Sequence, residues 1–236
     1  MLTRFLIGVA AVLAVASPPL AATPAEAPKR IVSINLCADE LLVTLADPAQ
    51  IAGLSVYASD PTLSFTADAA KAFRHDAASA ETVIGLSPDL VLAGRYTKRA
   101  TRDMLARLGY RLELLDAART IEDSVALIRK VAALVGHPER GEALVAEIEA
   151  ARQRAEAAAP PAKPTAAIYQ RRGYVTGGDS LSGELLAIAG FTNDGAPLAG
   201  KTGGFVPLER IVASPPDYIV VAASTRRNGE SCCRRS

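Results

Sequence analysis

The sequence contains no tryptophan, and aromatic residues make up only 5% of its 236 positions. Histidine is almost as scarce, because His75 and His137 are the only two and lie far apart in the chain. A metal centre built from histidines needs several converging ligands, so this scarcity argues against a resident metal. The 26 basic and 25 acidic residues nearly cancel, which argues against the strong positive field of a nucleic-acid-binding protein.

Cysteine is also rare, at three residues: Cys37, Cys232 and Cys233. An odd number leaves at least one thiol unpaired in a monomer. Cys37 lies in an apolar stretch, so we predict a small buried residue there. The sequence places no base beside it, which argues against a nucleophilic role. Cys232 and Cys233 are adjacent, and a disulfide between them would be strained.

A long apolar run is absent except near the N-terminus. There, one basic residue precedes an unbroken apolar run of twelve residues, 5–16, followed by small residues and prolines. A membrane-spanning helix needs about 20 apolar residues, so the run is too short to span a bilayer. This order predicts that residues 1–22 are a secretory signal peptide, cleaved after Ala22 or Ala16, and that the protein works in the periplasm. The alternative is a buried N-terminal helix. No cysteine ends the run, which argues against a lipid anchor there.

Short apolar segments alternate with amphipathic ones across residues 29–136. The apolar segments predict strands, and the amphipathic ones predict helices. This alternation indicates βαβ units with a mostly parallel sheet, and therefore a first α/β lobe. The expected strands are 30–34, 51–54, 90–93 and 111–115, and the expected helices are 39–45, 80–86, 97–108 and 120–135.

Residues 137–160 predict one long helix of roughly 30 Å, which begins at Pro138 and ends at a proline-rich linker. The α/β pattern then resumes over residues 164–224, with strands expected at 166–170 and 218–222 and helices at 180–189 and 207–213. This second lobe has fewer elements than the first. Residues 225–236 are polar and match no apolar period. We therefore expect an incomplete second lobe followed by an atypical tail.

An internal repeat relates the two lobes. The segments are SAETVIGLSPDLVLA, at 79–93, and PLERIVASPPDYIVVA, at 207–222. In each, a glutamate (Glu81 or Glu209) is followed seven residues later by Pro-Asp and then by an apolar strand. Chance is the alternative explanation, because short turns often use proline and aspartate. Two related lobes on a rigid helix would leave a cleft between them, which is a favoured place for a ligand.

These features together resemble a known family. RIVSINLCADELL, GLSVYASDP, the repeated Glu–Pro–Asp units and the long helix after Gly136 are similar to the periplasmic binding proteins of ABC importers for cobalamin, ferric siderophores and haem. The resemblance covers residues 29–224 and favours the cobalamin-binding members, because GLSVYASDP resembles their GVSSYSDYP-type segment. It implies the helical-backbone (class III) fold, with two α/β lobes bridged by one long helix and a ligand cleft between them.

The resemblance also implies a function. It suggests a monomer without enzymatic activity, cofactor or resident metal, which captures a corrinoid or ferric complex and delivers it to an inner-membrane permease. Glu81 and Glu209 match positions that pair with permease arginines, and such charge-assisted contacts would fix the docking register. The alternative is that each is simply an acid stabilised in a first helical turn.

Ligand residues in this family come from loops at strand ends. Arginines there would suit a carboxylate or phosphate, and aromatic residues would offer flat contact to a large ring. His75 stands where cobalamin-binding members carry a tryptophan, so it departs from their pattern. The candidate ligand-binding residues are Asn35, Tyr57, His75, Arg95, Tyr96, Arg171, Gly203, Gly204 and Phe205.

Three alternatives remain open. The first is a ferric-siderophore or haem binder of the same fold. The second is an exported α/β hydrolase using Ser180, because GDSLSG at 178–183 resembles an esterase signature, although this serine opens a helix late in the chain. The third is an interaction module without a ligand, which a closed surface between the lobes would favour.

Overall fold

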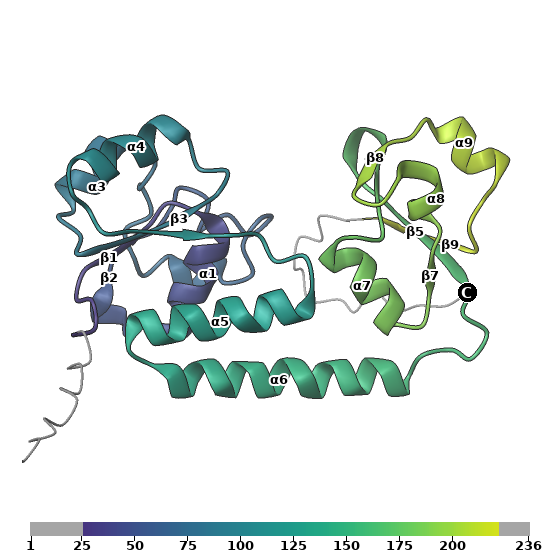
Figure 1. Cartoon of the computed structure of the whole chain (residues 1–236), viewed down its shortest axis with the longest axis horizontal. Helices are drawn as coiled ribbons and strands as arrows, with labels where there is room; N and C mark the ends of the chain where they lie inside the picture. The colour runs from purple at the N-terminus through teal and green to yellow at the C-terminus, as the bar shows by residue number, and fades with distance from the viewer. Residues whose placement is uncertain (1–25, 222–236) are drawn as a thin grey trace, which may run out of the picture.

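The computed structural model describes residues 26–221, so the predicted signal peptide and the tail at 225–236 lie outside the described residues. Two α/β lobes stand on the same side of one long helix, α6 (Pro138–Ala157), which runs beneath both (Figure 1). This arrangement confirms the fold predicted from the sequence. Within residues 26–221, no helix combines the length and the apolar character needed to cross a membrane.

The first lobe is built on a four-stranded parallel sheet in the order β2-β1-β3-β4. Parallel strands are normally covered by helices on both faces, and here the connecting helices provide that cover. The elements are β1 (Ile31–Ser33), α1 (Leu36–Leu45), β2 (Ile51–Gly53), α2 (Ala67–Ala70), α3 (Ala80–Gly85), β3 (Leu90–Gly94), α4 (Arg99–Arg107), β4 (Leu112–Leu115) and α5 (Ile121–Val135).

Successive buried side chains of these strands point to opposite faces of the sheet, and the residues they pack against show which helices cover each face. Along β3, Leu90 and Leu92 are buried in one apolar cluster with residues of α1 and α5. Val91, between them, is buried in a second cluster with residues of α3 and α4. Because successive side chains of a strand point to opposite faces, α1 and α5 cover one face and α3 and α4 the other (Figure 1).

Helix α6 is attached to the first lobe through α5. Thr120 and Asp123 form a reciprocal capping box at the start of α5, as their spacing predicts. Gly136 ends that helix in the left-handed conformation, with φ 88°, and Pro138 then begins α6. The two helices approach closely, because a Cβ on Gly141 would lie 2.6 Å from the Cβ of Ala132.

The second lobe has a mixed sheet in the order β7-β5-β6-β8, with β9 pairing with β5. Strands β7 and β9 run parallel to β5, whereas β6 runs antiparallel to β5 and β8. Its apolar cluster is small and centres on Val175, Val206 and Ile211. The elements are β5 (Thr165–Tyr169), β6 (Tyr174–Thr176), α7 (Leu181–Ile188), β7 (Thr192–Asn193), α8 (Gly195–Ala199), β8 (Gly203–Phe205), α9 (Leu208–Ala213) and β9 (Tyr218–Val221).

Two sequence expectations are corrected by the structure. Cys37 is exposed, not buried. The reason is that α1 begins at Leu36, before the predicted start, which places Cys37 on the outward side of its first turn. The residues 203–205, predicted as a loop, form strand β8, which pairs antiparallel with β6.

Candidate ligand-binding cleft

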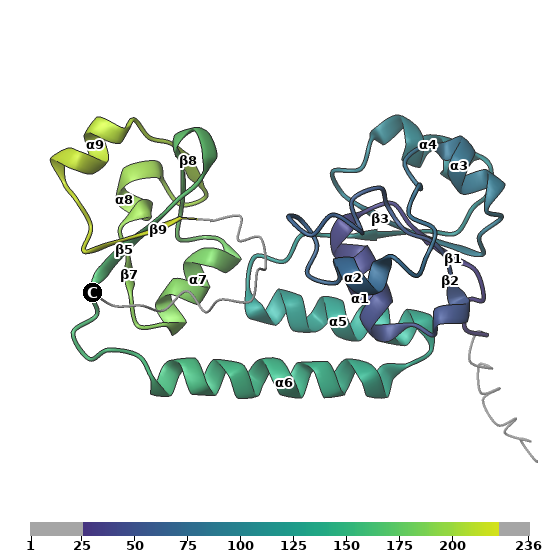
Figure 2. The same ribbon diagram turned by 180° about the vertical axis from the view of Figure 1, so that it is seen from behind.

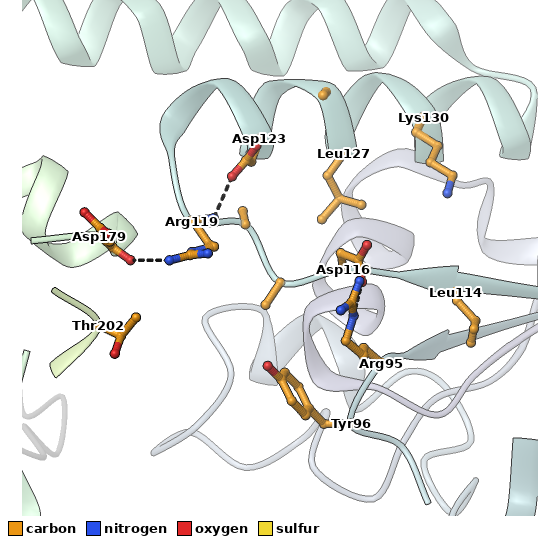
Figure 3. A pocket seen from close by; sticks show the side chains of 13 residues that line it. Arg95, Tyr96, Leu114, Asp116, Arg119, Asp123, Leu127, Lys130, Asp179 and Thr202 are labelled. Carbon is orange, nitrogen blue, oxygen red and sulfur yellow. Dashed lines mark hydrogen bonds and ion pairs between the residues drawn. The ribbon is translucent and has the colours of Figure 1, made fainter. Parts of the chain in front are cut away.

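A cavity of about 780 Å³ lies between the two lobes. The first lobe contributes the end of β4, the loops that follow β3 and β4, and one side of α5, and the second lobe contributes two residues from the opposite side (Figure 3). Residues of both lobes therefore form one concave surface. Its lining residues are Arg95, Tyr96, Leu114, Asp116, Ala117, Ala118, Arg119, Asp123, Ala126, Leu127, Lys130, Asp179 and Thr202.

Two of the cations in this lining are neutralised by neighbouring carboxylates. The Nε of Arg95 lies 2.6 Å from Oδ1 of Asp116, and this hydrogen bond holds the pKa of the Asp116 carboxyl below its usual value. The ammonium of Lys130 pairs with Glu113 on β4. These two cations are therefore less available to an anionic ligand.

Arg119 is placed differently. Its guanidinium is exposed and donates through Nη2 to the main-chain oxygen of Asp179, at 3.2 Å. Its own main-chain N–H donates to the carboxylate of Asp123 at 2.9 Å, which lowers the pKa of that carboxyl. Among the described residues, no carboxylate forms an ion pair with this guanidinium, so Arg119 has donors left for a ligand carboxylate or phosphate.

The lobes also contact each other directly beside the cavity. Oε2 of Glu184, on α7, accepts a hydrogen bond from the main-chain N–H of Ile121 at 2.7 Å. A side chain of the second lobe thus helps to cap α5 of the first lobe. The contact between Arg119 and Asp179, which Figure 3 draws, lies two residues earlier in the chain. Together with the continuous helix α6, these contacts constrain how far the lobes can separate.

Of the predicted ligand residues, Arg95 and Tyr96 line the cavity, and Tyr96 is 87% exposed. Asn35 follows β1, but its side chain accepts a hydrogen bond from the N–H of Ala38 and so caps α1. The same side chain packs against Gly94, where any Cβ would collide with it. The loop after β1 therefore lies beside the loop that carries Arg95. Tyr57 follows β2 and is 55% exposed.

Neither Asn35 nor Tyr57 lines this cavity, and the remaining predicted residues do not line it either. Residues 203–205 form β8, on the side of the second lobe that faces the first lobe in both views (Figures 1 and 2). Phe205 is exposed and makes an edge-to-face contact with Tyr174, with ring centroids 5.6 Å apart. Arg171 is exposed in the turn after β5. His75 is exposed, and its Nδ1 lies 2.9 Å from the main-chain oxygen of Phe73. Residues 26–221 contain no cluster of three or more potential metal ligands.

Most polar residues of the cavity were missed from the sequence. They are Asp116, Arg119, Asp123, Lys130, Asp179 and Thr202. A usable signal was present for the first two, because the segment DAART at 116–120 directly follows the fourth predicted strand. The carboxyl ends of parallel strands meet at one edge of a sheet, so this loop was a candidate on the same grounds as the three before it.

Ser180, the candidate nucleophile of the hydrolase alternative, is the N-cap of α7. Its Oγ accepts a hydrogen bond from the N–H of Gly183 at 3.1 Å and donates to the main-chain oxygen of Gly177 at 2.9 Å. The only two histidines of the chain are bonded elsewhere, His75 to Phe73 and His137 to Asp47 and Glu139. The Ser180 hydroxyl therefore bonds two main-chain groups, and neither partner is an imidazole.

Glu81 and Glu209 occupy equivalent places in the two lobes. Each lies in the first turn of a short helix, α3 or α9, and each is exposed. Both helices lie on the face of the molecule opposite α6 (Figure 1). The Ser79 side chain donates a hydrogen bond to Glu81 and lowers the pKa of its carboxyl, which favours the ionised form.

Comparison with known proteins gives a consistent result. A sequence profile described as periplasmic binding protein matches residues 31–231. A protein of Halobacterium salinarum named cobalamin-binding protein is 27% identical over 206 residues, which make up 85% of this chain and 55% of that protein. The chain thus spans little more than half the length of this curated relative.

Solved structures show the same fold. A possible iron-binding, periplasmic solute-binding protein of Staphylococcus epidermidis has a TM-score of 0.70 and 21% identity, over 83% of this chain and 78% of that one. A periplasmic haem-binding protein of Roseiflexus has a TM-score of 0.69 and 25% identity, over 82% and 76%. The periplasmic vitamin B12 binding protein of Vibrio cholerae has a TM-score of 0.64 and 16% identity, over 86% and 79%.

Proposed function

The chain belongs to the periplasmic binding protein family, and from that membership we propose that it captures a cobalamin or iron-complex ligand between its lobes. It would deliver this ligand to the permease of an ABC importer. The cavity of about 780 Å³, lined from both lobes, carries the proposal. This volume falls in the range of small-molecule sites, roughly 300–1,000 Å³.

The chemistry of the lining supports a large, flat ligand that bears anionic groups. Tyr96 offers an exposed aromatic face, and Arg119 offers a guanidinium without an ion-pair partner among the described residues. Corrinoids and haems combine a planar ring with phosphate or carboxylate groups. The names of the relatives, which include cobalamin-binding and haem-binding proteins, support the same class.

We further propose that the protein works in the periplasm and docks through Glu81 and Glu209. The family assignment and the predicted signal peptide at 1–22 support the location. The exposure of both glutamates on one face, opposite α6, supports the docking role, since a permease could then engage both lobes at once (Figure 1).

Titration of the purified protein with cyanocobalamin, haemin and a ferric siderophore tests the ligand. Calorimetry is a suitable readout, because the chain has no tryptophan to quench. We expect one of the three to saturate the protein at one site. Arg119→Ala should then weaken binding about tenfold, the loss expected for one charge-assisted contact.

The matched control is Arg107→Ala, which removes an exposed arginine from α4, outside the cavity lining. It should leave the affinity unchanged. Absence of heat for all three ligands would count against the proposed ligand class. An equal loss in both arginine variants would count against the cavity as the site.

A further inference from the structure

A buried carboxylate, Asp39 of α1, binds the start of the loop that carries Tyr57. Asp39 is fully buried, at 0% exposure. Its Oδ1 accepts from the N–H of Ser55 at 3.1 Å, and its Oδ2 accepts from the Ser55 hydroxyl at 2.5 Å. The same hydroxyl oxygen accepts from the N–H of Tyr57 at 3.3 Å. A chain of hydrogen bonds therefore runs from Tyr57 through Ser55 to Asp39.

Neighbouring residues extend this network to the far end of the loop and to the end of β1. Glu40, beside Asp39 on α1, accepts from the N–H of Phe65 at 2.7 Å and so holds the far end of the loop. Ser33, at the end of β1, lies close enough to Asp39 to lower its pKa, and its hydroxyl donates to the main-chain oxygen of Asn35 at 3.0 Å. Asp39 thus joins the two segments that carry Tyr57 and Asn35.

Burial of a carboxylate is costly, and packing alone does not require one at this position. Desolvation is the largest cause that raises the pKa of Asp39, and the charge of Glu40 adds to it, while Ser33 and Ser55 lower it; the net result is a pKa of about 6. Among the described residues, the groups that shift this pKa include no cation. Asp39 is therefore ionised at neutral pH and protonated in mildly acidic solution.

Other titratable groups surround this network. Cys37 lies on the same helix, where partial desolvation raises the pKa of its thiol and the charges of Glu40 and Asp39 raise it further. The segment 74–77 pairs with Leu54 and Ser55 and carries His75 together with the Arg74–Asp76 ion pair. A test of Asp39 must therefore include a variant that removes the imidazole of this neighbouring segment.

We propose that Asp39 is a positioning residue, whose anionic carboxylate acts through the Ser55 hydroxyl to hold the Tyr57 loop in the position seen here. The ionised carboxylate polarises the hydroxyl and so strengthens the bond from the N–H of Tyr57. A protonated Asp39 would donate to Ser55 instead, and this bond would weaken. The ligand-binding role of the loop rests on the proposed function, whereas the hold of Asp39 on the loop does not.

The absence of tryptophan allows a direct test, because Y57W would place the only tryptophan of the sequence in the loop, where it can be excited selectively over tyrosine. We expect its emission anisotropy to fall with a midpoint near pH 6 as the solution is acidified. In Y57W/D39N the transition should disappear, with the anisotropy at the acidic value throughout. Y57W/S55A should lose the transition as well, although Asp39 remains in place.

Two matched variants identify the titrating group. Y57W/H75Q should keep the transition, which would exclude the imidazole. Y57W/E40Q should keep it with a lower midpoint, because the charge of Glu40 raises the pKa of Asp39. Persistence of the transition in Y57W/D39N, or its loss in Y57W/H75Q, would overturn the proposal.

Hydrogen exchange across residues 55–65 makes the same comparison without substitution of Tyr57. At neutral pH, D39N should exchange faster than the wild type in this segment, and equal rates would overturn the proposal. Once a ligand has been identified by titration, D39N should bind it about tenfold more weakly. A protein that binds none of the tested ligands would contradict the proposed function, while the loop measurements would still decide the role of Asp39.

Discussion

Asp89 and Asp217 make the same contact in the two lobes. The carboxylate of Asp89 accepts from the N–H groups of Lys29 and Arg30, at 2.6 and 3.0 Å, just before β1. The carboxylate of Asp217 accepts from the N–H and the hydroxyl of Thr165, both at 2.8 Å, at the start of β5. The strands that follow the aspartates, β3 and β9, pair in parallel with these same strands. The structure thus confirms the repeat as a real correspondence.

The first prediction follows from this equivalence. Asp89→Ala and Asp217→Ala should each lower the urea midpoint of unfolding, because each removes the carboxylate that accepts hydrogen bonds at a strand start: two N–H groups for Asp89, one N–H and one hydroxyl for Asp217. Thr165→Val should have a smaller effect than Asp217→Ala, since it removes the hydroxyl and keeps the N–H. Far-UV circular dichroism would report the transitions. A lower urea midpoint for one aspartate variant and an unchanged midpoint for the other would contradict the equivalence.

The pH dependence of this contact has a definite sign. The N–H of Thr165, and then its hydroxyl, lower the pKa of the Asp217 carboxyl below its usual value. The stabilisation is therefore present above the unfolded-state pKa and is lost as the pH falls through the lowered one. The difference between the wild type and Asp217→Ala should shrink in strongly acidic solution.

The sequence predicted the first lobe well because its strands carry an unambiguous signal. Leu90 to Gly94 are all buried, and a short apolar run bounded by turn residues indicates such a strand. Strands β6 and β8 gave no such signal. Gly203 and Gly204 supply no apolar side chains to an alternating pattern, so they resembled a loop.

The site was harder to predict than the fold. Arg95 and Tyr96 were found because they directly follow an obvious strand, whereas Asp179 and Thr202 enter the cavity only through the packing of the lobes. The N-cap role of Asn35 and the burial of Asp39 depend on where α1 begins. That boundary lay three residues earlier than the sequence indicated.

The second prediction concerns the stability contributed by Asp39. Its pKa in the folded protein, about 6, lies above the usual 3.8, so the folded state binds the proton more tightly. The associated stabilisation is complete below the unfolded-state pKa and is lost as the pH rises through about 6. This pKa difference corresponds to a stabilisation of at most about 3 kcal/mol.

Asp39→Asn should therefore be more stable than the wild type at neutral pH and similar to it near the unfolded-state pKa. The amide can still accept from the N–H of Ser55 and donate to its hydroxyl, so the buried polar atoms stay paired although the loop loses its anionic acceptor. Urea unfolding of both proteins over this pH range measures the difference. A constant difference across the range would show that another group titrates.

The third prediction tests the attachment of the bridging helix. Gly141→Ala should destabilise the protein by about 1–2 kcal/mol, although alanine favours helix, because its Cβ would lie 2.6 Å from that of Ala132. Ala132→Gly in the same chain removes the clashing atom and should recover part of the loss. Gly85→Ala is a control, because a Cβ there meets nothing within 4 Å. Equal effects of Gly141→Ala and Gly85→Ala would contradict the close helix approach.

The fourth prediction separates a structural serine from a nucleophile. Ser180→Ala should cost about 1 kcal/mol, because it removes the N-cap of α7. Ser182→Ala, on the same helix and with no cap bond, should cost less. Hydrolysis of p-nitrophenyl esters should be at background in the wild type and in both variants. Turnover by the wild type that Ser180→Ala abolishes would support the hydrolase alternative instead.

The fifth prediction concerns the proposed docking to a permease. Glu81→Arg and Glu209→Arg should each weaken binding to the cognate permease in lipid nanodiscs about tenfold, because each replaces an attraction with a like-charge contact. The double variant should lose more than either single one, since the two carboxylates lie on separate lobes. The affinity for the ligand should stay unchanged, because neither residue lines the cavity.

Glu147→Arg provides the matched control for charge. Glu147 is also exposed, but it lies on α6, the helix opposite α3 and α9 (Figure 1). Reversal there changes the net charge of the protein equally, so a general electrostatic effect would weaken both sets of variants alike. A specific docking face predicts loss only for Glu81→Arg and Glu209→Arg. Added salt should reduce the wild-type affinity toward that of the double variant, because exposed charge pairs are screened over about 10 Å at 0.1 M ionic strength.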